Sequence, residues 1–233
     1  MVVFCNFKKF VLDILFPIKC LGCNMEGKWI CDSCQTDLKN NHFLCCPLCG
    51  IGNNDGSVCG YCQANSCLDG LFVVLEDNKL SRKLICHIKY NFITDLLLDL
   101  EKNIHKFLDE NPLWQDSFAL VPVPLHKKKL LKRGFSQASL IAETIGRVGG
   151  NKLNQLVIKR TKYTRPQVGL TANERRKNIL DNFSIGDCSG IDYNNPIVLV
   201  DDVYTTGSTL QECARTLKNA GYKRVMGLVL IRG

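Results

Sequence analysis

Two adjacent carboxylates followed by a run of hydroxyl side chains are the residues of this chain best suited to hold a small ligand. Residues 196–200 are apolar and mostly β-branched, as is typical of a strand buried on both faces of a parallel sheet. We expect Asp201 and Asp202 to end that strand, and a turn over 205–209 to open a helix over 210–220. Such a turn directs N–H groups, hydroxyls and the positive end of the helix dipole toward one point, which suits a phosphate.

The two acids add a second specificity to this turn. Carboxylates only accept hydrogen bonds, so Asp201 and Asp202 can bind a pair of vicinal hydroxyls, and a sugar phosphate satisfies both demands. In the competing interpretation, Thr206 and Ser208 merely cap a helix. We favour the ligand site because a cap needs one hydroxyl, whereas this loop supplies four around a glycine. The candidate ligand residues are Asp201, Asp202, Val203, Tyr204, Thr205, Thr206, Gly207, Ser208 and Thr209.

Cysteines form the second chemical signal. The chain has 14 cysteines, and ten of them lie between positions 20 and 67. We read no export signal, so this density indicates metal binding rather than a disulfide framework, which is the competing reading. Four C-x-x-C knuckles each allow two thiolates to approach one ion, and eight ligands make two closed, structural zinc sites. The candidate ligands are Cys20, Cys23, Cys31, Cys34, Cys46, Cys49, Cys59 and Cys62.

The pairing of the knuckles is left open by the sequence. Short loops favour the first knuckle with the second and the third with the fourth, as in a double zinc ribbon, but interleaved pairing is also compatible with the spacing. Cys45 stands beside Cys46, and either could be the ligand, although only Cys46 has the C-P-x-C spacing. We expect a metal-dependent module over residues 1–70 and a second domain over residues 71–233.

Charge is concentrated in one segment. The formal net charge is +8, yet residues 126–177 carry +12 and the remainder carries −4. An excess of this kind in one segment favours a face for a polyanion over an ordinary solvated surface, which would intersperse acids among the bases. The candidate anion-binding residues are His126, Lys127, Lys128, Arg133, Arg160, Arg175 and Arg176. Phe135, Tyr163 and Tyr204 lie among these bases and could stack on nucleobases or belong to the core.

The remaining pattern supplies the elements that position these residues. We expect strands over 70–75 and 118–124, helices over 80–90, 95–108 and 138–147, and a basic loop over 125–137. Residues 1–16 could form a short amphipathic helix, and the chain contains no apolar run long enough to span a membrane. Cys86, Cys188 and Cys213 lie in apolar surroundings and are expected in the core.

The stretch 196–210 resembles the motif that binds 5-phosphoribosyl-1-pyrophosphate (PRPP) in type I phosphoribosyltransferases. The resemblance implies that the acids hold the ribose hydroxyls and that the Thr/Gly/Ser loop holds the 5′-phosphate. It further implies that the basic stretch after the V-P-V-P strand approaches the pyrophosphate, and that residues 159–161 and 166–183 form a flap which closes over the substrate. Mg²⁺ is expected with PRPP to neutralise the pyrophosphate.

Taken in order, these motifs resemble the ComF (ComFC) competence family, with one departure at Ser136, where Asn is expected. The resemblance implies an α/β fold: a type I phosphoribosyltransferase-like parallel sheet domain with a small N-terminal double zinc ribbon. It implies a cytoplasmic protein that handles incoming single-stranded DNA in natural transformation beside a helicase. An active transferase acting on an amine or base is the alternative, although Thr205 replaces the Asp base of many 6-oxopurine transferases. A zinc module that docks protein partners is a third hypothesis.

Overall fold

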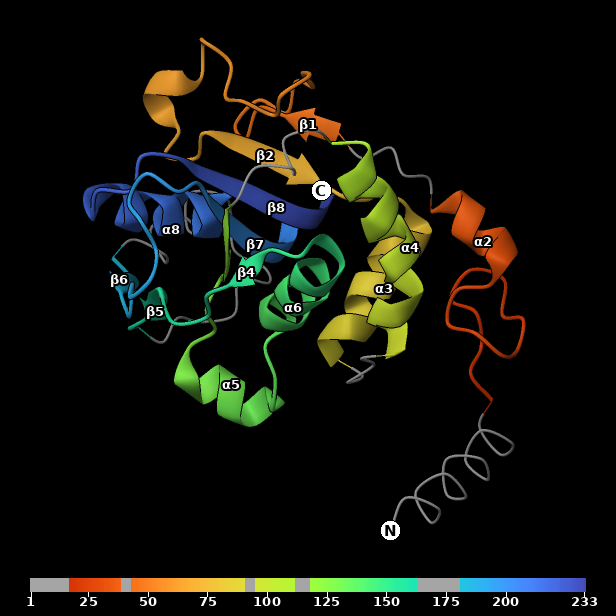
Figure 1. The fold of residues 1–233 in the computed structure, drawn as a ribbon. Coiled ribbons are helices and arrows are strands. Elements are labelled where there is room, and N and C mark those ends of the chain that lie inside the picture. Colours follow the sequence, from red (N-terminus) through yellow and green to blue (C-terminus); the bar gives the residue numbers. More distant parts are fainter. Residues whose placement is uncertain (1–16, 39–42, 91–94, 112–117, 163–180) are drawn as a thin grey trace.

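A six-stranded sheet forms the centre of the computed structural model, which describes residues 17–38, 43–90, 95–111, 118–162 and 181–233 (Figure 1). The strand order is β1-β2-β8-β7-β3-β4. β1 runs antiparallel to β2, and every other neighbouring pair is parallel, which confirms the expected parallel sheet. The strands are β1 (Phe43–Cys45), β2 (Gly70–Val73), β3 (Ala119–Pro122), β4 (Lys152–Leu153), β7 (Ile197–Tyr204) and β8 (Val225–Arg232).

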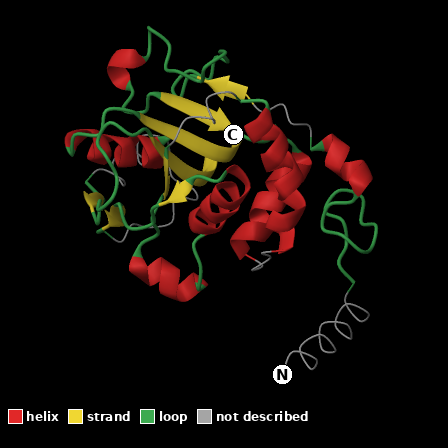
Figure 2. Cartoon of the chain, in the orientation of Figure 1, coloured by secondary structure: helices red, strands yellow, loops and turns green. Residues whose placement is uncertain are grey.

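Helices cover both faces of this sheet (Figure 2). Alternate residues of the central strands point to opposite sides, so Leu228 and Leu230 of β8 join one apolar core while Val229 joins the other. The first core contains α3 (Lys79–Tyr90), α4 (Asp95–Asp109) and α6 (Gln137–Gly149), and the second contains α8 (Ser208–Asn219). Burial on both faces explains why these strands read as continuous apolar runs. A separate two-stranded antiparallel sheet pairs β5 (Ile158–Arg160) with β6 (Phe183–Ile185).

Two sequence expectations about this region were wrong. The central strand β7 does not end at Asp201 but continues to Tyr204, because neighbouring β8 keeps pairing with it as far as Arg232. The hydrogen bonds between β7 and β8 are formed by backbone groups, so the polar side chains of Asp201 and Asp202 do not interrupt the strand. The basic stretch after β3 is not a loop either: Lys127–Arg133 forms α5, which begins at the N-cap residue His126 and ends at Gly134 in the left-handed conformation.

The cysteine-rich segment packs against the sheet domain. β1, which lies between the second and third knuckles, extends the sheet by pairing with β2. The short helices α2 (Asp32–Asp37) and η1 (Gln63–Asn65) belong to the same segment. Ile30 and Leu38 are buried in the core cluster that also holds residues of α3 and α4. The boundary at residue 70 stays a prediction. Among the described helices, none is long and apolar enough to cross a membrane.

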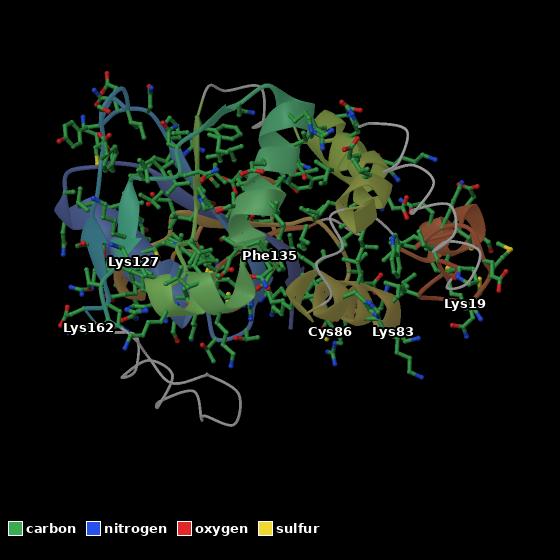
Figure 3. The ribbon with its side chains drawn as sticks, turned by 90° about the horizontal axis from the view of Figure 1, so that it is seen from below. Lys19, Lys83, Cys86, Lys127, Phe135 and Lys162 are labelled. Carbon is green, nitrogen blue, oxygen red and sulfur yellow. The ribbon has the colours of Figure 1, made fainter. Side chains whose placement is uncertain are left out.

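The expectation that three isolated cysteines lie in the core is confirmed only for Cys213, which is fully buried. Cys188 is half-buried and Cys86 is exposed. α3 buries Leu84 and Ile85, and the 100° step per residue turns position 86 outward. Cys86 accordingly lies on the outer surface of α3 (Figure 3).

Candidate functional site

A cavity of about 280 Å³ lies where β7 ends and α8 begins. It is lined by the acid pair, by the hydroxyl-rich turn and by a lysine from α3. Because the loops after parallel strands lie at one edge of the sheet, this is the edge at which ligands bind in such folds. The lining residues are Lys89, Asp201, Asp202, Val203, Tyr204, Thr205, Thr206, Gly207, Ser208, Thr209 and Leu210. The structure therefore places all nine candidate ligand residues around one cavity.

The negative charge of the acid pair is partly balanced by a lysine of the protein itself. Lys89 Nζ lies 3.0 Å from Asp202 Oδ2, and the backbone N–H of Asp202 donates to Asp201 Oδ1 over 2.9 Å. Burial, followed by the neighbouring charge of Asp202, raises the pKa of Asp201 to about 7. The sequence did not indicate Lys89 as a site residue, because it lies 112 positions before Asp201 and its only signal is a place on the polar face of an amphipathic helix.

The turn before α8 pairs one of its donors internally, because the backbone N–H of Ser208 donates to Thr206 Oγ1 over 3.5 Å. Gly207 is the N-cap residue, so it offers no side chain to the first-turn N–H groups of α8. Thr206 Oγ1 and Ser208 Oγ lie 2.8 Å apart and are hydrogen-bonded to each other. Gly207 has φ +69°, and a Cβ at this position would overlap the Tyr204 hydroxyl. Only glycine fits there, so the shape of this loop depends on Gly207.

A basic group lies close enough to Asp201 for the two charges to interact. Arg160 of β5 lies over the Phe183 ring at 5.4 Å, and burial lowers its pKa while the charge of Asp201 opposes that shift. Burial followed by the charge of Arg160 also lowers the pKa values of His126 and Lys129. Arg160 is therefore close enough to both His126 and Lys129 for the charges to interact. Such a cluster is suited to neutralising an anion with more than one charge.

The other predicted basic residues that the structure describes are not among those that line the cavity. Lys127, Lys128 and Arg133 belong to α5, where Lys127 and Lys128 are exposed and Arg133 is half-buried. Figure 3 shows Lys127 on this helix. Arg175 and Arg176, together with most of the predicted flap, lie outside the described residues. Among the aromatic candidates, Tyr204 is buried and Phe135 is half-buried; Tyr163 lies outside the described residues. A buried Tyr204 is not available to stack on a base.

The departure at Ser136 has a local explanation. Ser136 is the N-cap residue of α6, and its hydroxyl accepts a hydrogen bond from the backbone N–H of Ser139 over 3.3 Å. Asn is an equally good N-cap residue, so the replacement conserves the start of α6.

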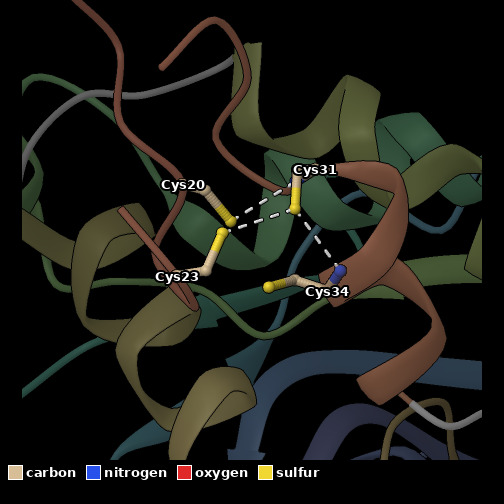
Figure 4. A group of neighbouring side chains, drawn as sticks. All are labelled: Cys20, Cys23, Cys31 and Cys34. Carbon is tan, nitrogen blue, oxygen red and sulfur yellow. Dashed lines mark hydrogen bonds between the residues drawn. The ribbon is translucent and has the colours of Figure 1, made fainter. Parts of the chain in front are cut away.

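Two groups of four cysteines have the geometry of metal centres. Cys20, Cys23, Cys31 and Cys34 form one group, shown in Figure 4, and Cys46, Cys49, Cys59 and Cys62 form the other. The Sγ atoms of Cys23 and Cys31 lie 3.6 Å apart, and those of Cys49 and Cys59 lie 3.7 Å apart. A tetrahedral zinc site with Zn–S bonds of about 2.3 Å requires S···S separations of about 3.8 Å. The donor set therefore fits zinc, and the short-loop pairing is the one observed.

The thiols of each group differ in pKa. Burial raises the pKa of Cys20, but hydrogen bonds from neighbouring backbone N–H groups outweigh it and lower the value to about 6. Burial and the surrounding sulfur atoms raise the pKa of Cys34 to about 12. The second group repeats the pattern, with Cys46 lowered to about 6 and Cys62 raised to about 12. Four thiolates gather in each group only with a cation among them, which fits a divalent metal.

The ambiguity between Cys45 and Cys46 is resolved in favour of Cys46. Cys45 is a residue of β1, and its fully buried side chain does not join the metal-type group. Instead, Arg232 Nη1 donates to Cys45 Sγ over 3.4 Å. Side chains alternate along a strand, so adjacent cysteines at its end point to opposite sides.

The fold and the sites together define the class of protein: a phosphoribosyltransferase-like α/β domain that carries an N-terminal double zinc ribbon. Residues 11–63 match the family model described as a double zinc ribbon domain. Over most of its length the chain is similar to competence protein ComFC and to DNA utilization proteins named YhgH, and over about half of its length to competence protein F.

Three relatives illustrate this similarity. Competence protein F of Haemophilus influenzae is 38% identical over 108 residues, which are 46% of this chain and 47% of that protein. Competence protein ComFC of Bacillus subtilis is 27% identical over 82% of this chain and 79% of its own length. DNA utilization protein YhgH of Escherichia coli O157:H7 is 28% identical over 93% of this chain and 97% of its own length.

Two solved structures match parts of this chain. Adenine phosphoribosyltransferase from Trypanosoma brucei is 14% identical, covers 70% of this chain and 83% of its own, and has a TM-score of 0.38. The allosteric regulatory enzyme of purine biosynthesis is 20% identical, covers 56% of this chain and 25% of its own, and has a TM-score of 0.33.

Proposed function

We propose that this chain binds PRPP together with Mg²⁺ and handles incoming single-stranded DNA during natural transformation. The observation that carries the proposal is the cavity in which the acid pair meets the hydroxyl-rich turn at the end of β7. The names of the relatives, competence and DNA utilization proteins, support the DNA-related part. Under this proposal the protein acts in the cytoplasm beside a helicase of the DNA-uptake machinery, and the zinc ions are structural.

Each group of residues has one role in this proposal. Asp201 and Asp202 would accept hydrogen bonds from the ribose hydroxyls, and the turn before α8 would donate to the 5′-phosphate. Arg160, His126 and Lys129 would face the pyrophosphate, whose charge Mg²⁺ would help to neutralise. Lys89 pairs with Asp202 and can exchange that contact for a ligand oxygen.

Binding is favoured over free-standing transferase chemistry. Thr205 is exposed and follows the acid pair by three positions, where a hydroxyl cannot serve unaided as a base on a purine. Turnover on another amine or base would release pyrophosphate, so a pyrophosphate assay on candidate acceptors separates the two functions.

Calorimetric titration of the zinc-loaded protein with Mg-PRPP tests the ligand site. The Asp201→Asn/Asp202→Asn variant should lose binding, because each amide removes an ionised acceptor from the cavity. Asp187→Asn/Asp192→Asn is the matched control, since both acids are exposed and accept hydrogen bonds from the nearby N–H groups of Ser189 and Asn194. Equal affinity of the wild type and the cavity variant would refute the site assignment.

Fluorescence anisotropy of a labelled single-stranded oligonucleotide tests the DNA-related part. Binding should weaken with salt, with log K falling by about 0.7 per neutralised phosphate for each tenfold rise in salt. Addition of Mg-PRPP should change the affinity if the cavity and the basic segment act as one system. Absence of binding at low salt would remove the DNA proposal and leave the PRPP proposal standing.

A further inference from the structure

The last strand carries an arginine that contacts both the second zinc group and the loop of the cavity. Arg232 ends β8, where its Cα is the register partner of Tyr204 on β7. Its guanidinium donates to the carbonyl oxygen of Cys46 over 3.0 Å and to that of Leu48 over 3.3 Å. Both carbonyls belong to the Cys46–Cys49 knuckle, so one side chain holds the backbone of a metal-binding turn.

The knuckle is shaped to receive this guanidinium. Gly50, directly after the knuckle, has φ +77°, and a Cβ there would lie 3.1 Å from Arg232 Nη2. Glycine therefore provides both the left-handed backbone conformation and the space for the arginine. The side chain of Cys45 supplies a further acceptor at 3.4 Å.

The same guanidinium contacts the cavity loop through an aromatic ring. Arg232 Cζ lies 5.0 Å from the centroid of the Tyr204 ring, within the range of a cation–π interaction. Tyr204 is 2% exposed, and its hydroxyl fills the space that a side chain at Gly207 would need. Gly207 is the N-cap residue of α8 and lines the cavity. Contacts therefore run without a break from the second knuckle through Arg232 and Tyr204 to the candidate phosphate loop.

We propose that Arg232 is a positioning residue that couples the second zinc ribbon to the ligand loop. With Arg232 in place, an ordered knuckle holds the Tyr204 ring, and the ring holds Gly207 and the first turn of α8 in the conformation that presents their N–H groups. Coupling is reciprocal, so a ligand in the cavity should in turn order the knuckle. The ligand part rests on the proposed function, but the ordering of the loop by Arg232 does not.

Hydrogen–deuterium exchange of the zinc-loaded full chain tests this coupling, because it reports each segment separately. Arg232→Met keeps an apolar stem and removes the guanidinium. Exchange of amides in residues 204–210 and 46–50 should rise about tenfold in this variant without any ligand. Arg224→Met is the matched control, because Arg224 is exposed and precedes β8 at the opposite end of the same strand.

A ligand arm gives the readout that a merely structural role would not change. In the wild type, Mg-PRPP should slow exchange in residues 46–50 of the second knuckle but not in residues 20–23 of the first. In Arg232→Met, the ligand should still protect residues 204–210 while its effect on residues 46–50 is lost. If Arg232→Met does not fold, Arg232→Lys replaces it. That variant should show a smaller rise at both segments, because an ammonium cannot stack flat on the ring and reach two carbonyls.

The outcomes separate this inference from the proposed function. Loop exchange in the ligand-free Arg232 variants that equals that of Arg224→Met would overturn the positioning role. A second outcome is slower exchange of residues 204–210 in the ligand-free wild type than in Arg232→Met, with no change on addition of Mg-PRPP. It would support the positioning role and refute PRPP as the ligand. Ligand protection of residues 46–50 that persists in Arg232→Met would refute the coupling route.

Discussion

Asp201 and Asp202 are held in different electrostatic states before any ligand binds. Asp202 is paired with Lys89 at 3.0 Å, whereas the pKa of Asp201 is raised to about 7 by burial and by the charge of Asp202. A carboxyl that costs free energy when ionised is typical of a site built for a ligand rather than for stability. Ionisation of Asp201 therefore lowers the free energy of unfolding, and the size of this effect depends on pH.

Asp201→Asn should stabilise the protein, and more so at higher pH. The folded pKa lies above the unfolded one, so the folded state binds the extra proton and its stability falls as pH rises toward 7, after which the penalty is complete. The Tm of the variant minus the Tm of the wild type should increase by about 2–4 °C from pH 6 to pH 8.5, equivalent to about 1 kcal/mol in the free energy of unfolding. Thermal scans at the two pH values measure this difference.

Asp187→Asn is the control for that experiment. The pKa of Asp187 is lowered by hydrogen bonds from Ser189, so removal of its charge gives no comparable gain. A Tm difference between Asp201→Asn and the wild type that is the same at both pH values would contradict the raised pKa.

At the scale of single residues, the sequence predicts contacts that are local along the chain. The acid pair, the hydroxyls and Gly207 are contiguous, and each C-x-x-C knuckle is self-contained, so their residue types and spacing suffice. Lys89 and Arg232 reach these sites from distant elements, and their roles depend on how the helices and strands pack. The mistaken prediction for Cys86 has the same origin, because its apolar neighbours say little about the exact rotation of α3.

Among the elements, the short helix α5 differs from the longer helices because none of its residues, all of which the structure describes, is buried. With no apolar face to bury, its sequence lacks the helical periodicity that identified α3 and α4, so it was expected as a loop. Its end signals were nevertheless legible: His126 accepts from the N–H of Lys128, and Gly134 adopts φ +83° after the last turn. Such a helix adds little apolar burial to the fold.

Neutralising α5 should weaken DNA binding without lowering stability. Lys127→Gln/Lys128→Gln/Arg133→Gln retains good helix formers and removes three charges. If each base contacts one phosphate, the slope of log K against log salt should fall by about 2 in magnitude, and Tm should change little because no core contact is lost. Fluorescence anisotropy at several salt concentrations measures the slope.

The corresponding control removes charge elsewhere. Lys28→Gln/Lys102→Gln/Lys106→Gln acts on exposed lysines of the first ribbon and α4, and the salt slope should stay as in the wild type. An equal loss of affinity in both triple variants would show that net charge, and not α5, governs binding.

The molecule as a whole is built around cores that its two predicted parts share. Cys20, Ile30 and Leu38 of the first ribbon belong to the same apolar cluster as Leu84, and β1 extends the central sheet. The order of ribbon and sheet domain was predictable, because each has a local signature. Their joint core was not, because the ribbon has few large apolar residues and nothing in its sequence specifies which surface they meet. Deletion of residues 1–70 would expose that surface, so it is a poor way to separate the functions of the parts.

Zinc removal should therefore destabilise the sheet domain as well as the ribbons. Without the metal, the thiols of both groups repel as they ionise, the knuckles open, and the shared core loses one wall. A strong chelator should lower the Tm of the helical circular dichroism signal by about 10 °C or more, since α3, α4 and α6 rest on that core. Chelator saturated with zinc is the control, and re-addition of zinc should restore the transition. A helical transition unchanged by chelation would mean that the sheet domain derives no stability from the ribbons, and the continuity of the core would then be only geometric.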